Sequence, residues 1–201
     1  MSEQLIISVG REFGSGGHLV AEMLAERFEL PLLDYNLLQE IVAGKNIDVS
    51  NLKKYDELPR SRLFHRTVKG HNSSPQYNIA QMQFDFIRRK AANGDSFVIV
   101  GRCAEEILRD DPALVSVFII GDHDKKRDRI RRLYNLNAED AEALMQVTNR
   151  KRKQYHNHYC TTKWGDSRNY ELSINTSRIG YEETADIIEQ YIRLRFPDWN
   201  K

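Results

Sequence analysis

The sequence alternates between short apolar runs and longer segments in which apolar residues recur at helical spacing. The apolar runs are rich in β-branched residues and lie at 5–9, 97–100, 114–120 and 170–175, with a shorter run at 30–33. Continuous apolar runs of this length are typical of parallel strands that are covered on both faces. The segments between them are long enough for crossover helices. The pattern therefore predicts an α/β fold, in which residues 30–33 can supply a fifth strand.

Helical spacing of apolar residues predicts the elements between the strands. The expected helices span 18–28, 35–42, 79–93, 104–109, 124–134, 138–158 and 181–195. Two regions interrupt the alternation. Residues 44–78 are polar and include Pro59 and Gly70, a composition typical of a binding loop or a mobile insert. Residues 121–169 are dense in cations, with the runs KKRDRIRR and RKRK.

Composition excludes several classes of protein. The 201 residues carry 30 Lys and Arg against 29 Asp and Glu, a formal charge of +1, and 40% are hydrophobic. This balance describes a globular protein and argues against a globally basic nucleic-acid-binding protein. No apolar run approaches the roughly 18 residues of a membrane helix, and the N-terminal run is too short for a signal peptide. We therefore expect a cytoplasmic protein with one domain over residues 1–201 and no membrane partner.

The chain has two cysteines, Cys103 and Cys160. They lie far apart in the sequence and have neither a CxxC partner nor histidines at metal-ligand spacing nearby. We expect two unpaired thiols, without a structural disulfide or a metal site.

A glycine-rich segment directly follows the first predicted strand and precedes the first predicted helix. It reads SVGREFGSGGH over residues 8–18, and its second half consists of Gly14, Ser15, Gly16, Gly17 and His18. Such a turn can surround a phosphate with backbone N–H groups, helped by the partial positive charge at the helix N-terminus. Glycine clusters also form tight turns without a ligand. The pattern favours phosphate binding, and a ligand-free turn is the alternative.

This segment departs from the standard P-loop pattern GxxxxGK[ST]. In that register Arg11 takes the place of the first glycine, Gly17 that of the lysine, and His18 that of the serine or threonine. Because the lysine normally neutralises the β- and γ-phosphates, another cation replaces it or the site holds phosphate without efficient transfer. Arg11 is the nearest candidate, and a solvated loop arginine is the alternative interpretation.

Three stretches of the chain together resemble the cytidylate kinase-like proteins of bacteria, a branch of the nucleoside monophosphate kinases. They span residues 7–41, 97–110 and 149–184, and they include GREFGSGG, FVIVGRC and KWGD. The resemblance implies a P-loop NTPase-type three-layer sandwich, in which helices flank a five-stranded parallel sheet. It also implies a nucleoside monophosphate-binding insert at about 35–78 and a lid at about 121–169.

The resemblance assigns roles to individual residues. Asp34 matches the aspartate that opens the monophosphate-binding segment, and Gly101-Arg102 matches a motif whose arginine contacts the monophosphate. An arginine fork suits the geometry of a phosphate. Asp34 as a helix N-cap, and Arg102 paired with Asp34 or Glu105, are the structural alternatives. Cys103 stands where cytidylate kinases have an aspartate, which puts selectivity for cytosine in question.

Four arginines of the cationic region are further candidate catalytic residues. Arg127 and Arg131 are four residues apart on one helix face, and Arg150 and Arg152 align with lid arginines of the family. Phosphoryl transfer relies on cations around the transferred group and on closure that excludes water. A solvated helix face is the alternative for each pair. The KWGD segment at 163–166 has no role that we can assign beyond packing or docking of the lid.

These features predict an ATP-dependent kinase that acts on CMP or dCMP, with ATP and Mg²⁺ as cofactors and no metal ligand assigned in the chain. The alternative is a regulator that binds nucleotides and has lost the transfer step, favoured by the missing lysine and by Cys103. An RNA-binding module using RKRKQYHNHY at 150–159 is a weaker interpretation, because the flanking charge is balanced. The oligomeric state stays open.

Overall fold

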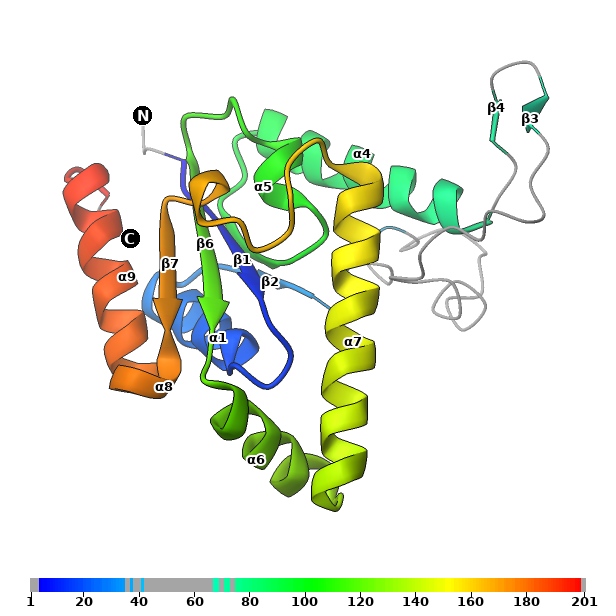
Figure 1. The fold of residues 1–201 in the computed structure, drawn as a ribbon. Coiled ribbons are helices and arrows are strands. Elements are labelled where there is room, and N and C mark those ends of the chain that lie inside the picture. The colour runs from blue at the N-terminus through cyan, green and yellow to red at the C-terminus, as the bar shows by residue number, and fades with distance from the viewer. Residues whose placement is uncertain are drawn as a thin grey trace.

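A parallel sheet of five strands forms the centre of the fold (Figure 1). The computed structural model describes residues 4–34, 37, 41, 67–68, 71–72 and 75–199. The strand order is β2-β5-β1-β6-β7, with bounds β1 Ile6–Arg11, β2 Leu32–Leu33, β5 Phe97–Val100, β6 Leu114–Ile120 and β7 Leu172–Asn175. On the central strand β1, Ile6 aligns with Phe97 of β5 and with Leu114 of β6. The predicted α/β class and five-stranded parallel sheet are confirmed.

Helices connect the strands and cover the sheet on both faces. Their bounds are α1 Gly17–Arg27, α4 Pro75–Ala92, α5 Ala104–Ile107, α6 His123–Tyr134, α7 Ala138–Tyr159, α8 Thr176–Ile179 and α9 Tyr181–Arg195, with a 3-10 turn, η1, at Ser167–Asn169. Two further strands, β3 Thr67–Val68 and β4 His71–Asn72, form a separate antiparallel pair.

The alternation of side chains along β1 divides the core into two layers. Ile7 and Val9 pack with α1 and α9 on one face, whereas Ile6 packs with α4 and α5 on the other. All three side chains are fully buried. Complete burial of a side chain of this size stabilises the fold by about 1.5–3 kcal/mol relative to an exposed one. The result is a three-layer sandwich that holds the strand ends in fixed positions.

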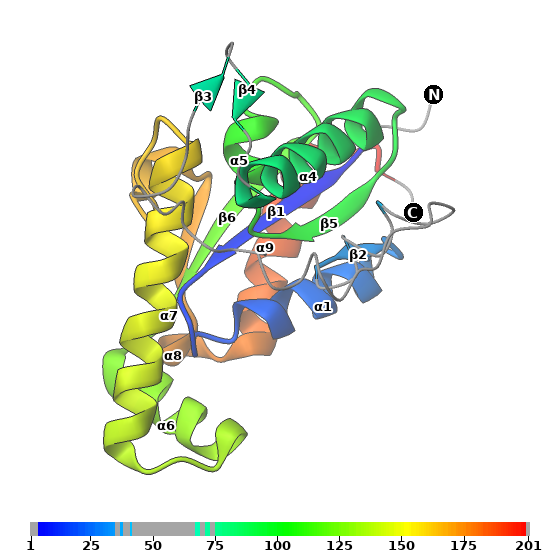
Figure 2. The same ribbon diagram turned by 90° about the vertical axis from the view of Figure 1, so that its right-hand side faces the viewer.

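The helix pair α6 and α7 makes up most of the cationic region. The two helices pack on each other through Ile130, Ala141 and Met145, all buried. Figure 2 shows the pair on the side of the molecule toward which the strands run. Ligands of open α/β sheets bind outside the carboxyl ends of the strands. The cations of this region therefore lie near the end of the sheet where a site is expected.

The structure differs from the sequence-based expectation at several element ends. Helix α4 begins at Pro75, inside the segment expected to be a loop, because proline suits the first turn of a helix. Helix α5 ends at Ile107, two residues early. Of the expected helix at 35–42 only residues 37 and 41 are described, and most of the expected insert at 35–78 lies outside the described residues. Across the described ranges, no helix combines the length and the hydropathy needed to cross a membrane.

Candidate functional site

The glycine-rich loop joins β1 to α1 with two residues in the left-handed region. Gly14 has φ +84° and Gly16 has φ +82°, and a side chain at Gly16 would overlap the ring of Tyr181. Ser15 fixes the turn, since its Oγ donates to the Glu12 carbonyl at 2.9 Å and accepts from the Gly17 N–H at 3.4 Å. Within the described residues, the N–H groups of Gly14 and Gly16 have no hydrogen-bond partner. The loop therefore offers two backbone donors to an anion at the start of a helix.

Arg11 occupies the space that a side chain at position 17 would need. A Cβ on Gly17 would lie 2.5 Å from the Arg11 Cβ and 3.1 Å from the Ile119 Cβ. The Arg11 guanidinium continues toward Gly101, where a Cβ would overlap its Nη1 unless the guanidinium shifted. Arg11 is buried, at 8% exposure. Arg11 replaces the first P-loop glycine and Gly17 replaces the lysine. The two replacements depend on each other, because Arg11 fills the space beside Gly17.

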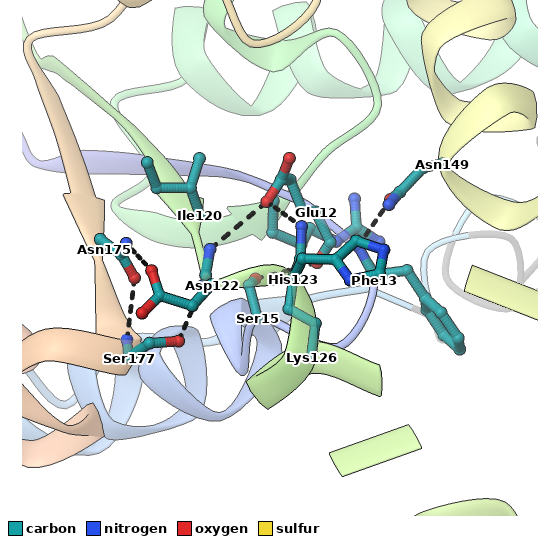
Figure 3. A network of polar contacts seen from close by, with 12 residues as sticks. Glu12, Phe13, Ser15, Ile120, Asp122, His123, Lys126, Asn149, Asn175 and Ser177 are labelled. Carbon is teal, nitrogen blue, oxygen red and sulfur yellow. Dashed lines mark hydrogen bonds and ion pairs between the residues drawn. The ribbon is translucent and has the colours of Figure 1, made fainter. Parts of the chain in front are cut away.

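A second cation reaches the loop from α6. Lys126 Nζ lies 2.6 Å from Glu12 Oε2, and the same oxygen accepts the Gly121 N–H at 3.3 Å (Figure 3). The Lys126 side chain is buried, and its carbonyl backs onto Gly14. Sequence analysis did not select Lys126, because it lies inside a cationic run that reads as a solvated helix face. Only its distance from Glu12 in the fold distinguishes it from its neighbours.

Helix α7 docks on the same loop. Asn149 Oδ1 accepts the Phe13 N–H at 2.7 Å, as Figure 3 shows. Arg152 Nη1 donates to the Arg11 carbonyl at 3.3 Å, and its guanidinium lies 5.5 Å from the centre of the Phe13 ring. The helix of the expected lid is therefore in contact with the loop in this structure.

Three of the arginines selected from the sequence meet at one cavity. Arg11 comes from the end of β1, Arg102 from the turn after β5, and Arg152 from α7, and all three line a cavity of about 30 Å³. Its other lining residues are Gly10, Gly101, Cys103, Glu105, Tyr155, His156, Trp164 and Tyr170. Arg102 is buried with φ +60°, so the turn after β5 holds it in place. A cavity of this size has room for water and is too small for a nucleotide.

The remaining arginines selected from the sequence lie elsewhere. Arg127 pairs with Asp124 at 3.1 Å and Arg131 with Asp128 at 3.5 Å, each across one turn of α6. Arg150 is exposed on α7. The structure thus brings Arg152 to the cavity and keeps the other three outside it.

Asp34 and His18, both selected from the sequence, form a pair. Asp34 Oδ2 lies 2.8 Å from His18 Nδ1, and Asp34 is buried just after β2. This hydrogen bond raises the pKa of His18 above its usual value, against the opposing effect of burial. The first turn of α1 is therefore tied to the carboxyl end of β2, across the entrance to the glycine loop.

Replacing His18 tests this pair through the dependence of stability on pH. A raised pKa in the folded state means that the stabilisation is complete below the unfolded pKa of 6.5 and disappears as the pH rises through the folded pKa. We expect His18→Gln to lower the free energy of unfolding more at about pH 5.5 than at about pH 9. Urea denaturation of both proteins at the two pH values measures this, and a difference independent of pH would contradict the pairing.

Glu105 and His156 are further residues of the cavity that sequence analysis did not select as site residues. His156 Nε2 lies 2.7 Å from Glu105 Oε1, and both side chains are buried. The signal available in the sequence was the spacing of Arg152 and His156, four residues apart on one helix. Trp164 of the KWGD segment also lines the cavity and packs edge-on against Phe118 at 5.3 Å. This segment therefore fastens the chain after α7 to β6.

A family model and a solved structure both match most of the chain. The model of the cytidylate kinase-like family matches residues 6–178. A crystal structure of an uncharacterized protein from Eubacterium ventriosum ATCC 27560 is 40% identical, covers 94% of this chain and 98% of its own, and superposes with a TM-score of 0.75. No curated protein sequence matches the chain.

More distant solved structures identify the fold. Shikimate kinase from Bacteroides thetaiotaomicron is 12% identical over 94% of this chain and 98% of its own, with a TM-score of 0.56. Shikimate kinase from Acinetobacter baumannii, solved in complex with shikimate, is 16% identical over 94% of this chain and 93% of its own, with a TM-score of 0.54. At these identities the likeness shows the fold alone, which is that of the P-loop-type kinases.

Proposed function

Because the chain belongs to the cytidylate kinase-like family, we propose that it is a cytoplasmic kinase that transfers the γ-phosphoryl group of ATP to CMP or dCMP. The observation that carries the proposal is the meeting of Arg11, Arg102 and Arg152 beside the glycine loop. The described lining of the cavity carries the guanidinium groups of these three arginines together with Glu105 and His156. Guanidinium groups suit bidentate contacts with phosphate oxygens, so this lining supports a phosphate-bearing ligand.

The position of each group suggests its role. The N–H groups of Gly14 and Gly16 would bind ATP phosphates, with Arg11 as the cation in place of the P-loop lysine. Arg102 would hold the acceptor phosphate in a bidentate contact, and Arg152 would approach the transferred group from α7. An acceptor oxygen then attacks the γ-phosphorus as the bond to the β-γ bridging oxygen breaks, and ADP leaves. The acceptor phosphate is already ionised, so no general base is needed.

The small volume of the cavity implies that binding requires movement. At about 30 Å³ the cavity excludes a nucleotide, so α7 has to move away from the loop before the acceptor enters. The contacts to be broken include the hydrogen bonds of Asn149 with Phe13 and of Arg152 with Arg11, and the contact of the Arg152 guanidinium with the Phe13 ring. Each of the two hydrogen bonds is of a kind that contributes about 0.5–1.5 kcal/mol.

Mg²⁺ would enter this site with ATP. In the described part of the chain, no three His, Cys, Asp or Glu side chains are grouped to hold a metal ion. Mg²⁺ in kinases is held chiefly by substrate phosphates and water, with one or two carboxylates, so the donor set fits delivery of the ion on ATP. When bound, the ion supplies charge neutralisation at the phosphates. Glu12, beside the loop, is one carboxylate that could make a water-mediated contact.

A nucleotide-binding regulator without transfer is the second candidate function. The ion pair of Lys126 with Glu12 favours it, since this cation is already neutralised at the loop. Such a protein would bind ATP through the same N–H groups and would respond to the nucleotide by a change in the docking of α7.

Two measurements on the purified protein distinguish these functions: ADP release and thermal shift. Both are made with ATP and Mg²⁺ and with CMP, dCMP, UMP or AMP as the acceptor. For the kinase we expect ADP release that depends on the acceptor and is fastest with CMP or dCMP. Stabilisation by ATP without ADP release would support the regulator. A protein that shows no stabilisation by ATP and no ADP release would contradict both functions.

Matched variants on α7 connect that assay to the site. Arg152→Ala should lower kcat/KM about 100-fold, because a cation that contacts the transferred group is lost. Lys151→Ala removes a neighbouring cation that is exposed on the same helix and should leave kcat/KM unchanged. Equal rates for the two variants would show that Arg152 only docks the helix.

A further inference from the structure

The two thiols of the chain lie together at the junction of α5 and α7. Cys103 is the residue before α5 and Cys160 the residue after α7, and Cys160 packs against the cluster of buried side chains that contains Cys103. They belong to one cluster that includes Phe84 and Tyr155. Cys103 is buried, whereas Cys160 is half-buried and reaches solvent. Both cysteines are free thiols in this structure, and their proximity was not predicted from the sequence.

An acid-base pair lies beside Cys160. His156 lies one helical turn before Cys160, whose N–H donates to the His156 carbonyl at 2.8 Å, and its Nε2 lies 2.7 Å from Glu105 Oε1. Although burial opposes it, the hydrogen bonds to Cys160 and Glu105 raise the pKa of His156 to about 10, so the ring is an imidazolium near neutral pH. The cluster thus places a positive charge next to one sulfur of a dithiol pair.

The two sulfurs are chemically unequal. The hydrogen bond from Cys103, and after it the contact with His156, lower the pKa of Cys160 to about 7 against the effect of burial. The hydrogen bond with Cys160 and burial raise the pKa of Cys103 well above its usual value. Cys160 is therefore the more acidic of the two thiols. This division corresponds to an attacking and a resolving cysteine.

We propose that Cys160 and Cys103 form a reversible dithiol-disulfide site whose oxidant is a hydroperoxide. The Cys160 sulfur attacks one peroxide oxygen, the S–O bond forms as the O–O bond breaks, and the leaving oxygen takes a proton from His156. The Cys103 sulfur then attacks the sulfur of the resulting sulfenic acid, losing its own proton, and the S–S bond forms as water leaves. With hydrogen peroxide, two thiols lose two electrons and the peroxide becomes two molecules of water.

Contacts around the pair hold the two chain segments against one another. Glu106 of α5 accepts hydrogen bonds from the Thr161 N–H at 3.2 Å, the Thr161 hydroxyl at 2.6 Å and the Thr162 hydroxyl at 2.8 Å. The residues after Cys160 are therefore held against α5, next to Cys103. A disulfide requires the Cα and Cβ atoms of its two cysteines to be close together. The Glu106 hydrogen bonds favour this by holding the segment after α7 against α5.

The chain has only these two cysteines, so an intramolecular disulfide can have only one connectivity. Full-length protein is treated with hydrogen peroxide, then analysed by thiol titration under denaturing conditions and by intact mass. We expect loss of both thiols, a mass decrease of about 2 Da, a monomeric product, and full recovery with dithiothreitol. Thiols that survive peroxide, or disulfides that form only between chains, would overturn the proposal.

Variants assign the order of the steps. Cys103→Ser should accumulate a sulfenic acid on Cys160 that a cyclic 1,3-diketone traps, and Cys103→Ala should do the same if serine disturbs the buried cluster. Cys160→Ser should leave Cys103 unreactive, at least about tenfold slower than the wild type. Reaction of Cys103 at the wild-type rate in that variant would overturn the assignment.

The role of the imidazolium has a matched control on the same helix. His156→Gln removes the positive charge beside the Cys160 sulfur and should slow thiol loss about tenfold. His158→Gln changes a nearby exposed histidine and should react at the wild-type rate. Circular dichroism confirms that each variant is folded, and equal rates for both variants would remove His156 from the site.

Discussion

Gly17→Lys, which recreates the lysine of the standard P-loop pattern, is expected to destabilise the protein by about 3 kcal/mol and to give no gain in phosphoryl transfer. The reason is steric, because a Cβ at position 17 meets the Cβ of Arg11 at 2.5 Å and that of Ile119 at 3.1 Å. Cβ atoms are fixed to the backbone, so the overlap is relieved only if β1 or α1 shifts. Urea denaturation gives the change in stability, and the ADP assay gives the rate.

A double variant separates the steric cause from any other effect of the new lysine. Arg11→Ala keeps the interfering Cβ, whereas Arg11→Gly removes it. We therefore expect Arg11→Gly/Gly17→Lys to recover about 2 kcal/mol of the loss, seen as a coupling energy in a double-mutant cycle. A single variant as stable as the wild type would contradict the packing of Arg11 against Gly17.

Contacts between distant segments account for most of what the sequence left undetermined at this site. The strands were predictable because runs such as 97–100 and 114–120 are apolar throughout, and the glycine loop because its residues are contiguous. The pairs Glu12–Lys126 and Cys103–Cys160 join residues far apart in the chain. Their proximity follows from strand order and from the docking of α7, which periodicity does not encode.

The arginines illustrate the same limit. The sequence surroundings of Arg127, Arg131 and Arg152 are similar, since each lies in a predicted helix rich in cations. The rotation of α6 and α7 in the fold places only Arg152 at the cavity and leaves the other two paired with aspartates of their own helix. Selection among similar side chains therefore requires the helix orientation, which depends on core residues such as Ile130 and Met145.

Arg102→Ala is expected to raise the Kd for CMP about 100-fold and to change the Kd for ATP by less than about threefold, since one fork of charge-assisted hydrogen bonds is lost. Arg102 is buried, and the turn after β5 directs its side chain to the cavity. It is far along the sequence from Gly14 and Gly16, whose N–H groups are the proposed ATP contacts. Isothermal titration with each nucleotide measures the two affinities separately. Arg102→Lys keeps the charge without the planar fork and should fall between the wild type and Arg102→Ala.

Both variants of Arg102 keep a non-glycine residue at φ +60°, so any backbone cost is common to them and cancels in their comparison. Arg109→Ala removes an exposed arginine of the following segment, whose partner is Glu106, and should leave both affinities unchanged. Equal losses for CMP and ATP in Arg102→Ala would make Arg102 a structural residue of the turn. A selective loss for CMP would instead place the acceptor phosphate at Arg102, which follows Gly101, while the Arg11 side chain spans from Gly17 of the glycine loop to Gly101.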